Sequence, residues 1–190
     1  MKKATLAVVA ITMLVLNQAT AQNSRSEEAL LENLRSKRIQ NRPSGGEVAI
    51  TEQEGEANVS LVQQVQTSTV ANQANVLQVG SYNHTSLQQH GSGIGATISQ
   101  YGNGNAYEGS LLGNNLQSEV VQQGNGNAVN QQVRGNNLDY SLIQLGNNNT
   151  INQIEITPAS KSYQVVQEGN NMNITIEQSR GFVPVTVQKQ

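Results

Sequence analysis

The chain has 190 residues, a formal net charge of -2 and no cysteine, with 13% of its residues charged and 3% aromatic. Asparagine and glutamine contribute 24 residues each, and the hydrophobic fraction is 36%, below the roughly 45–50% of ordinary globular domains. This composition excludes disulfides and thiolate sites and gives no basic surplus for nucleic acid. It leaves either a disordered polar chain or a fold that stacks side-chain amides.

Residues 1–21 have the features of a secretory signal peptide. Lys2 and Lys3 precede an apolar run over residues 4–16, and Ala19-Thr20-Ala21 supplies small residues for cleavage. The run is shorter than the roughly 20 residues of a spanning helix, although an uncleaved anchor is the alternative. We therefore expect a secreted mature chain that begins near Gln22 and contains no membrane span.

Residues 22–56 form a charged segment without the repeat that follows. They hold five of the 11 Lys and Arg residues and seven of the 13 Asp and Glu residues. Leu30, Leu31 and Leu34 would share one side of a short amphipathic helix over 28–39, which Pro43 and the following glycines end. The segment is interpreted either as a solvated linker or as an export handle for a secretion pore or escort protein.

A repeat with a nearly constant step dominates the rest of the chain. A Gln-x-Gly triplet recurs five times, and the step between copies is 22 in the first three intervals and 23 in the last. The single insertion falls near residues 157–159. Between residues 80 and 146 a glycine stands at every eleventh position. The glycines assigned to turns are Gly80, Gly91, Gly102, Gly113, Gly124, Gly135, Gly146 and Gly169.

Each half of a repeat is typical of a strand followed by a turn. Small and aliphatic residues alternate before each triplet, as in Ala74, Val76 and Gln78, which is the period of a strand with one buried face. The turns are rich in Gly and Asn, which reach positive φ at least cost. Successive hairpins in a flat meander are the alternative, but the constant step favours coils that stack on one another. We therefore predict an all-β, amyloid-forming β-solenoid with two facing parallel sheets, a degenerate lead-in strand within 57–71, and a repeat domain over 72–190 with five units and a terminal half unit.

Stacked coils place equivalent side chains over each other at about 4.8 Å. Each interior amide would then donate to one neighbouring amide and accept from the other, which avoids the cost of burying unpaired polar groups. The sequence predicts two such ladders, a glutamine column and an asparagine column at a turn: Gln78, Gln100, Gln122, Gln144 and Gln167, with Asn83, Asn105, Asn127 and Asn149.

The Gln-x-Gly-x-x-Asn pattern at this step resembles the curlin repeat of bacterial curli fibre subunits, over about residues 72–182. The resemblance implies self-assembly into an extracellular amyloid fibre, a pilus or fimbrium of the biofilm matrix, with a role in cell adhesion. The implied partners are further copies of the chain, a companion curlin subunit, an outer-membrane secretion pore and escort proteins. A major subunit and a minor nucleator subunit both remain open.

Two further interpretations are weighed against the fibre subunit. His84 and His90 lie in or beside expected turns and the repeat carboxylates are scattered, so neither a general base nor the paired acids of a glycosidase are indicated. We expect no enzyme activity, catalytic residue, cofactor or metal. The other interpretation is a monomeric, capped β-solenoid adhesin that binds carbohydrate or host protein, but such a protein needs polar end caps, which the sequence does not indicate.

Overall fold

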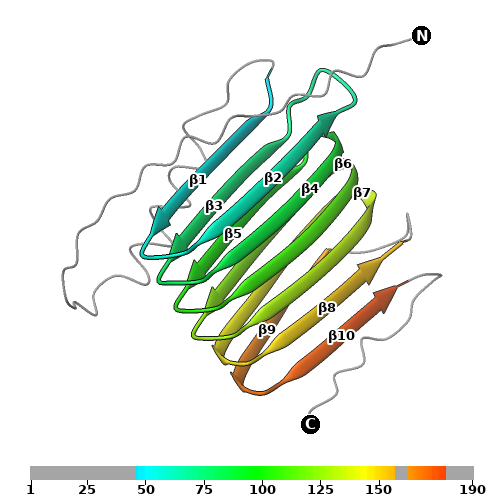
Figure 1. Ribbon diagram of the computed structural model, residues 1–190. Coiled ribbons are helices and arrows are strands. Elements are labelled where there is room, and N and C mark those ends of the chain that lie inside the picture. Colours follow the sequence, from blue (N-terminus) through cyan, green and yellow to red (C-terminus); the bar gives the residue numbers. More distant parts are fainter. Residues whose placement is uncertain (1–45, 157–161, 179–190) are drawn as a thin grey trace.

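The computed structural model describes residues 46–156 and 162–178, and in these ranges the chain is a β-solenoid of about six coils without any helix (Figure 1). This confirms the predicted all-β solenoid with two facing parallel sheets, whereas amyloid formation stays a prediction. The strands are β1 (Val48–Glu54), β2 (Val59–Gln66), β3 (Gln73–Val79), β4 (His84–Ser92), β5 (Gly95–Tyr101), β6 (Ala106–Gln123), β7 (Ala128–Asn147), β8 (Thr150–Glu155), β9 (Tyr163–Asn170) and β10 (Asn173–Gln178).

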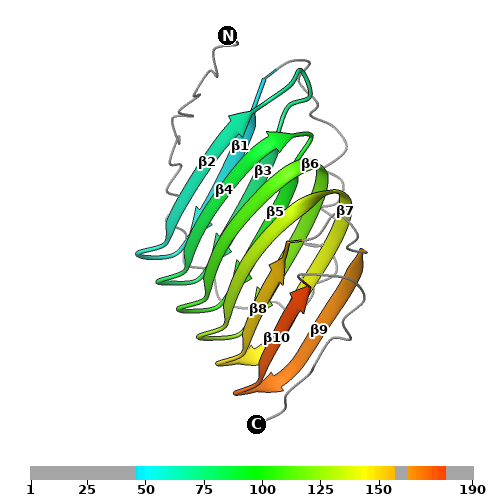
Figure 2. The ribbon, with the colours of Figure 1, turned by 90° about the vertical axis from the view of Figure 1, so that its right-hand side faces the viewer.

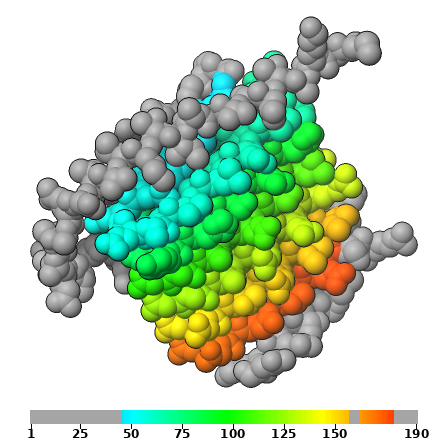
Figure 3. Space-filling model, in the orientation of Figure 1, coloured from blue at the N-terminus to red at the C-terminus, as the bar shows by residue number. Residues whose placement is uncertain are grey.

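The strands form two facing layers in which every pairing is parallel (Figures 1 and 2). Sheet 1 contains β1, β3, β5, the second halves of β6 and β7, and β9. Sheet 2 contains β2, β4, the first halves of β6 and β7, β8 and β10. Strands β6 and β7 run through a corner and so belong to both sheets. The coils therefore stack in sequence order, and Figure 3 shows them as successive bands of colour from the N-terminal to the C-terminal end.

The core is a thin layer between the two sheets. Alternate residues of each strand point inward. Ala74, Val76 and Gln78 of β3 are therefore buried, and each lies next to its equivalent in β5, Ala96, Ile98 or Gln100. Ile, Leu and Val fill most of this layer, and Tyr107 and Tyr140 are its largest side chains. Because the coil is narrow, the inward face also buries many amides, and these need partners.

The corners between sheet 1 and sheet 2 require glycine. Gly102 has a φ of +114°, and a Cβ built there would lie 2.1 Å from the carbonyl oxygen of Gly124 in the next coil. The same conformation and the same close approach recur at Gly80, Gly124 and Gly146. Side chains are therefore excluded both by the backbone conformation and by the stacking distance.

The coils begin earlier in the chain than the repeat spacing predicts. Strand β1 lies within the segment that we interpreted as charged and outside the repeat, and it pairs with β3 along its whole length. Strand β2 completes this first coil and is a full strand rather than a degenerate one. The step from Gln53 to Gln78 is 25 instead of 22, and residues 67–72 between β2 and β3 absorb the difference.

Several predicted features lie outside the described residues. These are the signal peptide over 1–21, the amphipathic helix over 28–39, the insertion near 157–159 and the terminal half unit after residue 182. Within the described ranges, no helix is long and apolar enough to cross a membrane.

Candidate functional site: stacked amides and two ends

The glutamine ladder runs through all six coils. Each Nε2 donates to the Oε1 of the equivalent glutamine in the next coil, at 2.5 to 2.9 Å between the heavy atoms. Gln78, Gln100, Gln122, Gln144 and Gln167 are fully buried. The first rung, Gln53, was not among the predicted residues, although Gln53-Glu54-Gly55 is the same Gln-x-Gly triplet.

The ladder also links the two sheets and has a direction. The second Nε2 hydrogen of Gln100 goes to the carbonyl oxygen of His84 in sheet 2, at 3.0 Å, and four other rungs make the equivalent bond. All amides point the same way, so the donors face the C-terminal end of the stack and the acceptors face the N-terminal end. Each interior rung thus uses both of its Nε2 hydrogens.

The asparagine column bonds differently from our expectation. Its side chains do not bond amide to amide, because each one clamps the backbone of the next coil. Asn83 Oδ1 accepts the backbone N–H of Asn105 at 3.0 Å, and Asn83 Nδ2 donates to the carbonyl of Gly102 at 2.8 Å. The clamp is made by Asn58, Asn83, Asn105, Asn127 and Asn149. In the sixth coil Met172 occupies this position, and its backbone N–H donates to Asn149 Oδ1.

A stacked asparagine ladder does exist, but it lies on the exposed outside of the same corner. Asn103, Asn125 and Asn147 each donate through Nδ2 to the Oδ1 of the next asparagine, and the series ends at Asn170. The same Oδ1 atoms also accept backbone N–H groups from the preceding coil. The Gly-Asn-rich turns thus join coils as well as reverse the chain.

A buried polar chain occupies the interior of the last four coils. Tyr107 Oη and Ser118 Oγ both donate to Gln131 Oε1, at 2.8 and 2.9 Å. From there the chain continues through Gln153 to Tyr163 Oη, which donates to a carboxylate oxygen of the buried Glu155. Burial raises the pKa of both tyrosines far above the usual range, and for Tyr163 the charge of Glu155 raises it further. Nothing in the sequence pattern indicated this chain of hydrogen bonds.

The two ends of the stack carry the only strand edges that remain unpaired within the described ranges. Strands β1 and β2 pair on one side only, with β3 and β4, while β9 and β10 pair on one side only, with β7 and β8. The ends differ in burial, because Thr51 and Gln53 in the first coil are half-buried whereas Gln167 and Ile176 in the last coil are buried. The N-terminal end is therefore the more accessible one.

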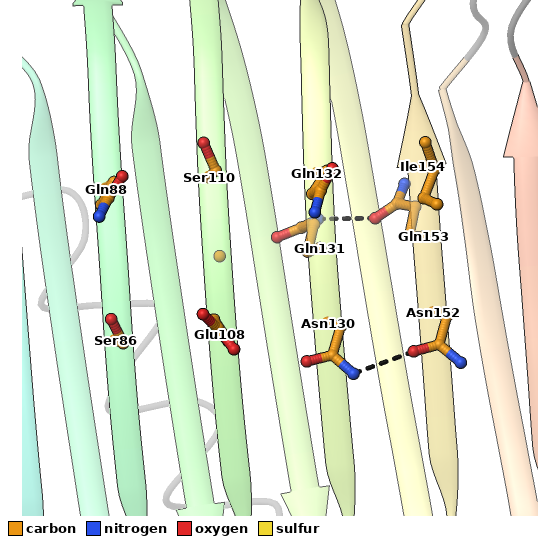
Figure 4. Close-up of a pocket in the computed structure, with 11 residues that line it drawn as sticks. Ser86, Gln88, Glu108, Ser110, Asn130, Gln131, Gln132, Asn152, Gln153 and Ile154 are labelled. Carbon is orange, nitrogen blue, oxygen red and sulfur yellow. Dashed lines mark hydrogen bonds between the residues drawn. The ribbon is translucent and has the colours of Figure 1, made fainter.

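A shallow groove of about 380 Å³ crosses the outside of sheet 2 (Figure 4). One wall consists of Ser86, Glu108, Asn130 and Asn152, and the other of Gln88, Ser110, Gln132 and Ile154. Asn130 Nδ2 donates to Asn152 Oδ1 at 2.9 Å along the first wall. The lining provides one carboxylate, Glu108, together with hydroxyl and amide groups, so the groove offers hydrogen bonds to a ligand.

The histidines and carboxylates do not converge on a site. His84 and His90 are exposed on the outside of β4, and among the described residues no three His, Cys, Asp or Glu side chains are close enough to hold a metal ion.

Comparison of the chain with known protein families, curated proteins and solved structures finds no match. The ladders and the two ends are therefore the candidate functional features of this molecule.

Proposed function

We propose that this chain is a secreted structural subunit that polymerises end to end into an extracellular, curli-like amyloid fibre. One observation carries the proposal, namely that the glutamine ladder ends in complementary groups. Within the described residues, Gln53 Oε1 at one end receives no donor, and Gln167 Nε2 at the other has one hydrogen beyond its bond to Thr150. A second copy stacked head to tail would satisfy both groups.

The strand register supports the same arrangement. Continuing the stack brings β1 of a second copy beside β9 and its β2 beside β10. Gln53 then lies over Gln167, and Gln64 lies over Gln178, because these residues hold equivalent positions in their coils. Unpaired strand edges are templates for further pairing, and the resulting spacing of about 4.8 Å is that of amyloid.

The biological setting is part of the proposal and rests on the sequence. The signal peptide supports export, and the curlin-like repeat supports a fibre of the biofilm matrix that takes part in cell adhesion. A secretion pore with escort proteins and a companion subunit would be the partners. Both a major subunit and a nucleator are compatible with two adhesive ends.

The proposal is tested by blocking the exposed edge of β1. Val48 donates its N–H to Asn72 beside β3, and successive residues of a parallel strand bond to opposite sides, so the N–H of Thr51 points to the free edge. Thr51→Pro removes this donor, and a proline is tolerated at a sheet edge. We expect the purified chain to give thioflavin-positive fibres with a meridional reflection at about 4.8 Å, and Thr51→Pro to abolish their elongation from preformed seeds.

Thr51→Val is the matched control, because it removes the same hydroxyl but keeps the N–H. It should elongate at the rate of the unmodified chain. A chain that remains monomeric at high concentration would overturn the proposal and favour the monomeric adhesin. Equal elongation of the proline and valine variants would show that β1 is not an assembly edge.

A further inference from the structure

The outer faces of the two sheets have different chemistry. Outward positions on sheet 2 are mostly polar and exposed, as Ser110 and Asn130 illustrate. Outward positions on sheet 1 include a largely apolar row along the stack. This row contains Leu77, Val121, Ile143 and Val166, together with Ser99 in the middle and Glu52 at the N-terminal end. Val79 and Leu145 lie in the adjoining row, which ends in Glu54 and Glu168. A solvated sheet face normally alternates with its buried face in polarity, so the apolar surface of sheet 1 requires an explanation.

The middle of this apolar surface is buried. Ser99 lies between the inward residues Ile98 and Gln100, so its side chain points outward, yet it is only 1% exposed. Its outward neighbours Thr97 and Val121 are 9% and 7% exposed. Ser110, an outward serine of sheet 2, is exposed by contrast. The described strands form only the two facing layers, so none of them covers this surface.

We propose that residues 22–45 of the same chain dock on the outer face of sheet 1. This segment contains Leu30, Leu31 and Leu34, which share one side of the predicted helix and match an apolar strip. The inference is independent of the proposed fibre function. It gives the charged segment an intramolecular role in addition to any role in export.

Charge complementarity supports this occupant. The described residues carry ten Asp and Glu side chains and a single cation, Arg134. Residues 22–45 carry five Lys and Arg side chains against three Glu. Glu119 lies on the outward row of sheet 1 next to that of Val121, and Asp139 lies on the outward row beyond it. The segment therefore brings cations to a face that has carboxylates and no cation among the described residues.

Residues 22–45 join the described chain at the edge of sheet 1 and are long enough to reach the middle of its outer face. The described chain begins at Gly46, immediately before β1, which is the first strand of sheet 1. Three inter-strand spacings separate β1 from the part of β6 that contains Val121, which is about 14 Å. A helix over residues 28–39 would be about 18 Å long. The segment is therefore long enough to reach the buried centre of the face, and in that position it would shield the face from sideways association with other copies.

Thiol labelling tests the docking, because the chain has no cysteine of its own. Ser99→Cys places one thiol on the covered face, and Ser110→Cys places a matched thiol on the open face. In the chain that begins at Gln22, we expect a bulky maleimide to label the first variant at least about tenfold more slowly than the second. Replacing Leu30, Leu31 and Leu34 by Ser should abolish this difference, with an unchanged β-sheet circular dichroism spectrum as the control for folding.

Four outcomes would overturn the inference. Equal labelling of the two thiols would show an open face. Protection of Ser99→Cys that survives the three leucine replacements would show a different occupant, as would protection that requires residues 1–21. Protection that grows with protein concentration would identify the occupant as a second copy, bound sideways.

Discussion

A buried glutamine at the centre of this protein connects three coils through its side-chain hydrogen bonds. Gln122 accepts from Gln100, donates to Gln144 and donates to the carbonyl of Ala106 across the interior. Removing such a side chain leaves buried donors and acceptors without partners, and each of these costs about 1–3 kcal/mol. Amide side chains therefore stabilise this narrow core in the way that large apolar residues stabilise a wide one.

We predict that Gln122→Ala lowers the free energy of unfolding by about 2–5 kcal/mol, because it adds a cavity to the unpaired groups. Urea unfolding followed by circular dichroism measures this loss. Gln132→Ala, on the exposed wall of the groove, is the control and should change stability by less than about 0.5 kcal/mol. Equal effects of the two substitutions would contradict the stabilising role of the ladder. The Gln122 variant should also lengthen the lag before fibres form.

At the scale of a coil, the corner glycines and the asparagine clamps set the spacing. The corner carbonyl of one coil lies against the corner glycine of the coil before it, and the clamp fixes the same two coils through Nδ2 and Oδ1. A close backbone approach and its hydrogen bonds thus occur at the same place. This explains why Gly and Asn recur together at a fixed distance in the sequence.

We predict that Gly102→Ala is far more damaging than Gly104→Ala. At Gly102 the φ is +114° and the new Cβ would overlap the carbonyl of Gly124, so we expect a loss of at least about 3 kcal/mol. At Gly104 the φ is +66° and nothing lies within 4 Å of a Cβ, so only the left-handed conformation is penalised, by about 1–2 kcal/mol. Thermal unfolding of the two variants compares these losses, and similar melting temperatures would contradict the stacking argument.

The constant step explains how much of this arrangement could be predicted from the sequence. It identifies the coil, the inward column from Gln78 to Gln167 and the corner positions, because stacking makes equivalent residues neighbours. It misses the first coil, since the longer connection before β3 breaks the spacing even though Gln53, Gly55 and Asn58 match the motif. It also misses the clamp geometry and the polar chain through Tyr107 and Tyr163, because these depend on side-chain direction across the interior rather than on spacing.

At the scale of the whole molecule, the described stack is strongly acidic, with one cation against ten carboxylates. Head-to-tail stacking would place Glu54 of one copy beside Glu168 of the next, because both occupy the same outward row. Like charges directly opposite each other across strands are unfavourable. The proposed junction thus combines complementary amides inside with repelling carboxylates outside.

We therefore predict that salt accelerates fibre growth. Raising the ionic strength from about 0.01 M to about 0.15 M shortens the Debye length from about 30 Å to about 8 Å, and the elongation rate from seeds should increase severalfold. Glu54→Gln should elongate faster at low salt and depend less on salt. Glu108→Gln, on the outer face of sheet 2 away from the ends, is the control that removes one charge elsewhere. Equal acceleration by both substitutions would mean that net charge, and not the junction, limits growth.

The coils stack in the order in which they occur along the chain, and this order allows folding to proceed from one coil to the next. Each strand pairs only with the equivalent strands of the coils directly before and after it, which are also its neighbours along the chain. Folding of such an array can nucleate in one place and propagate between nearest neighbours, and no contact has to wait for a distant part of the polypeptide. A chain that emerges from a membrane pore one end first could therefore fold as it leaves, with every finished coil acting as the template for the next.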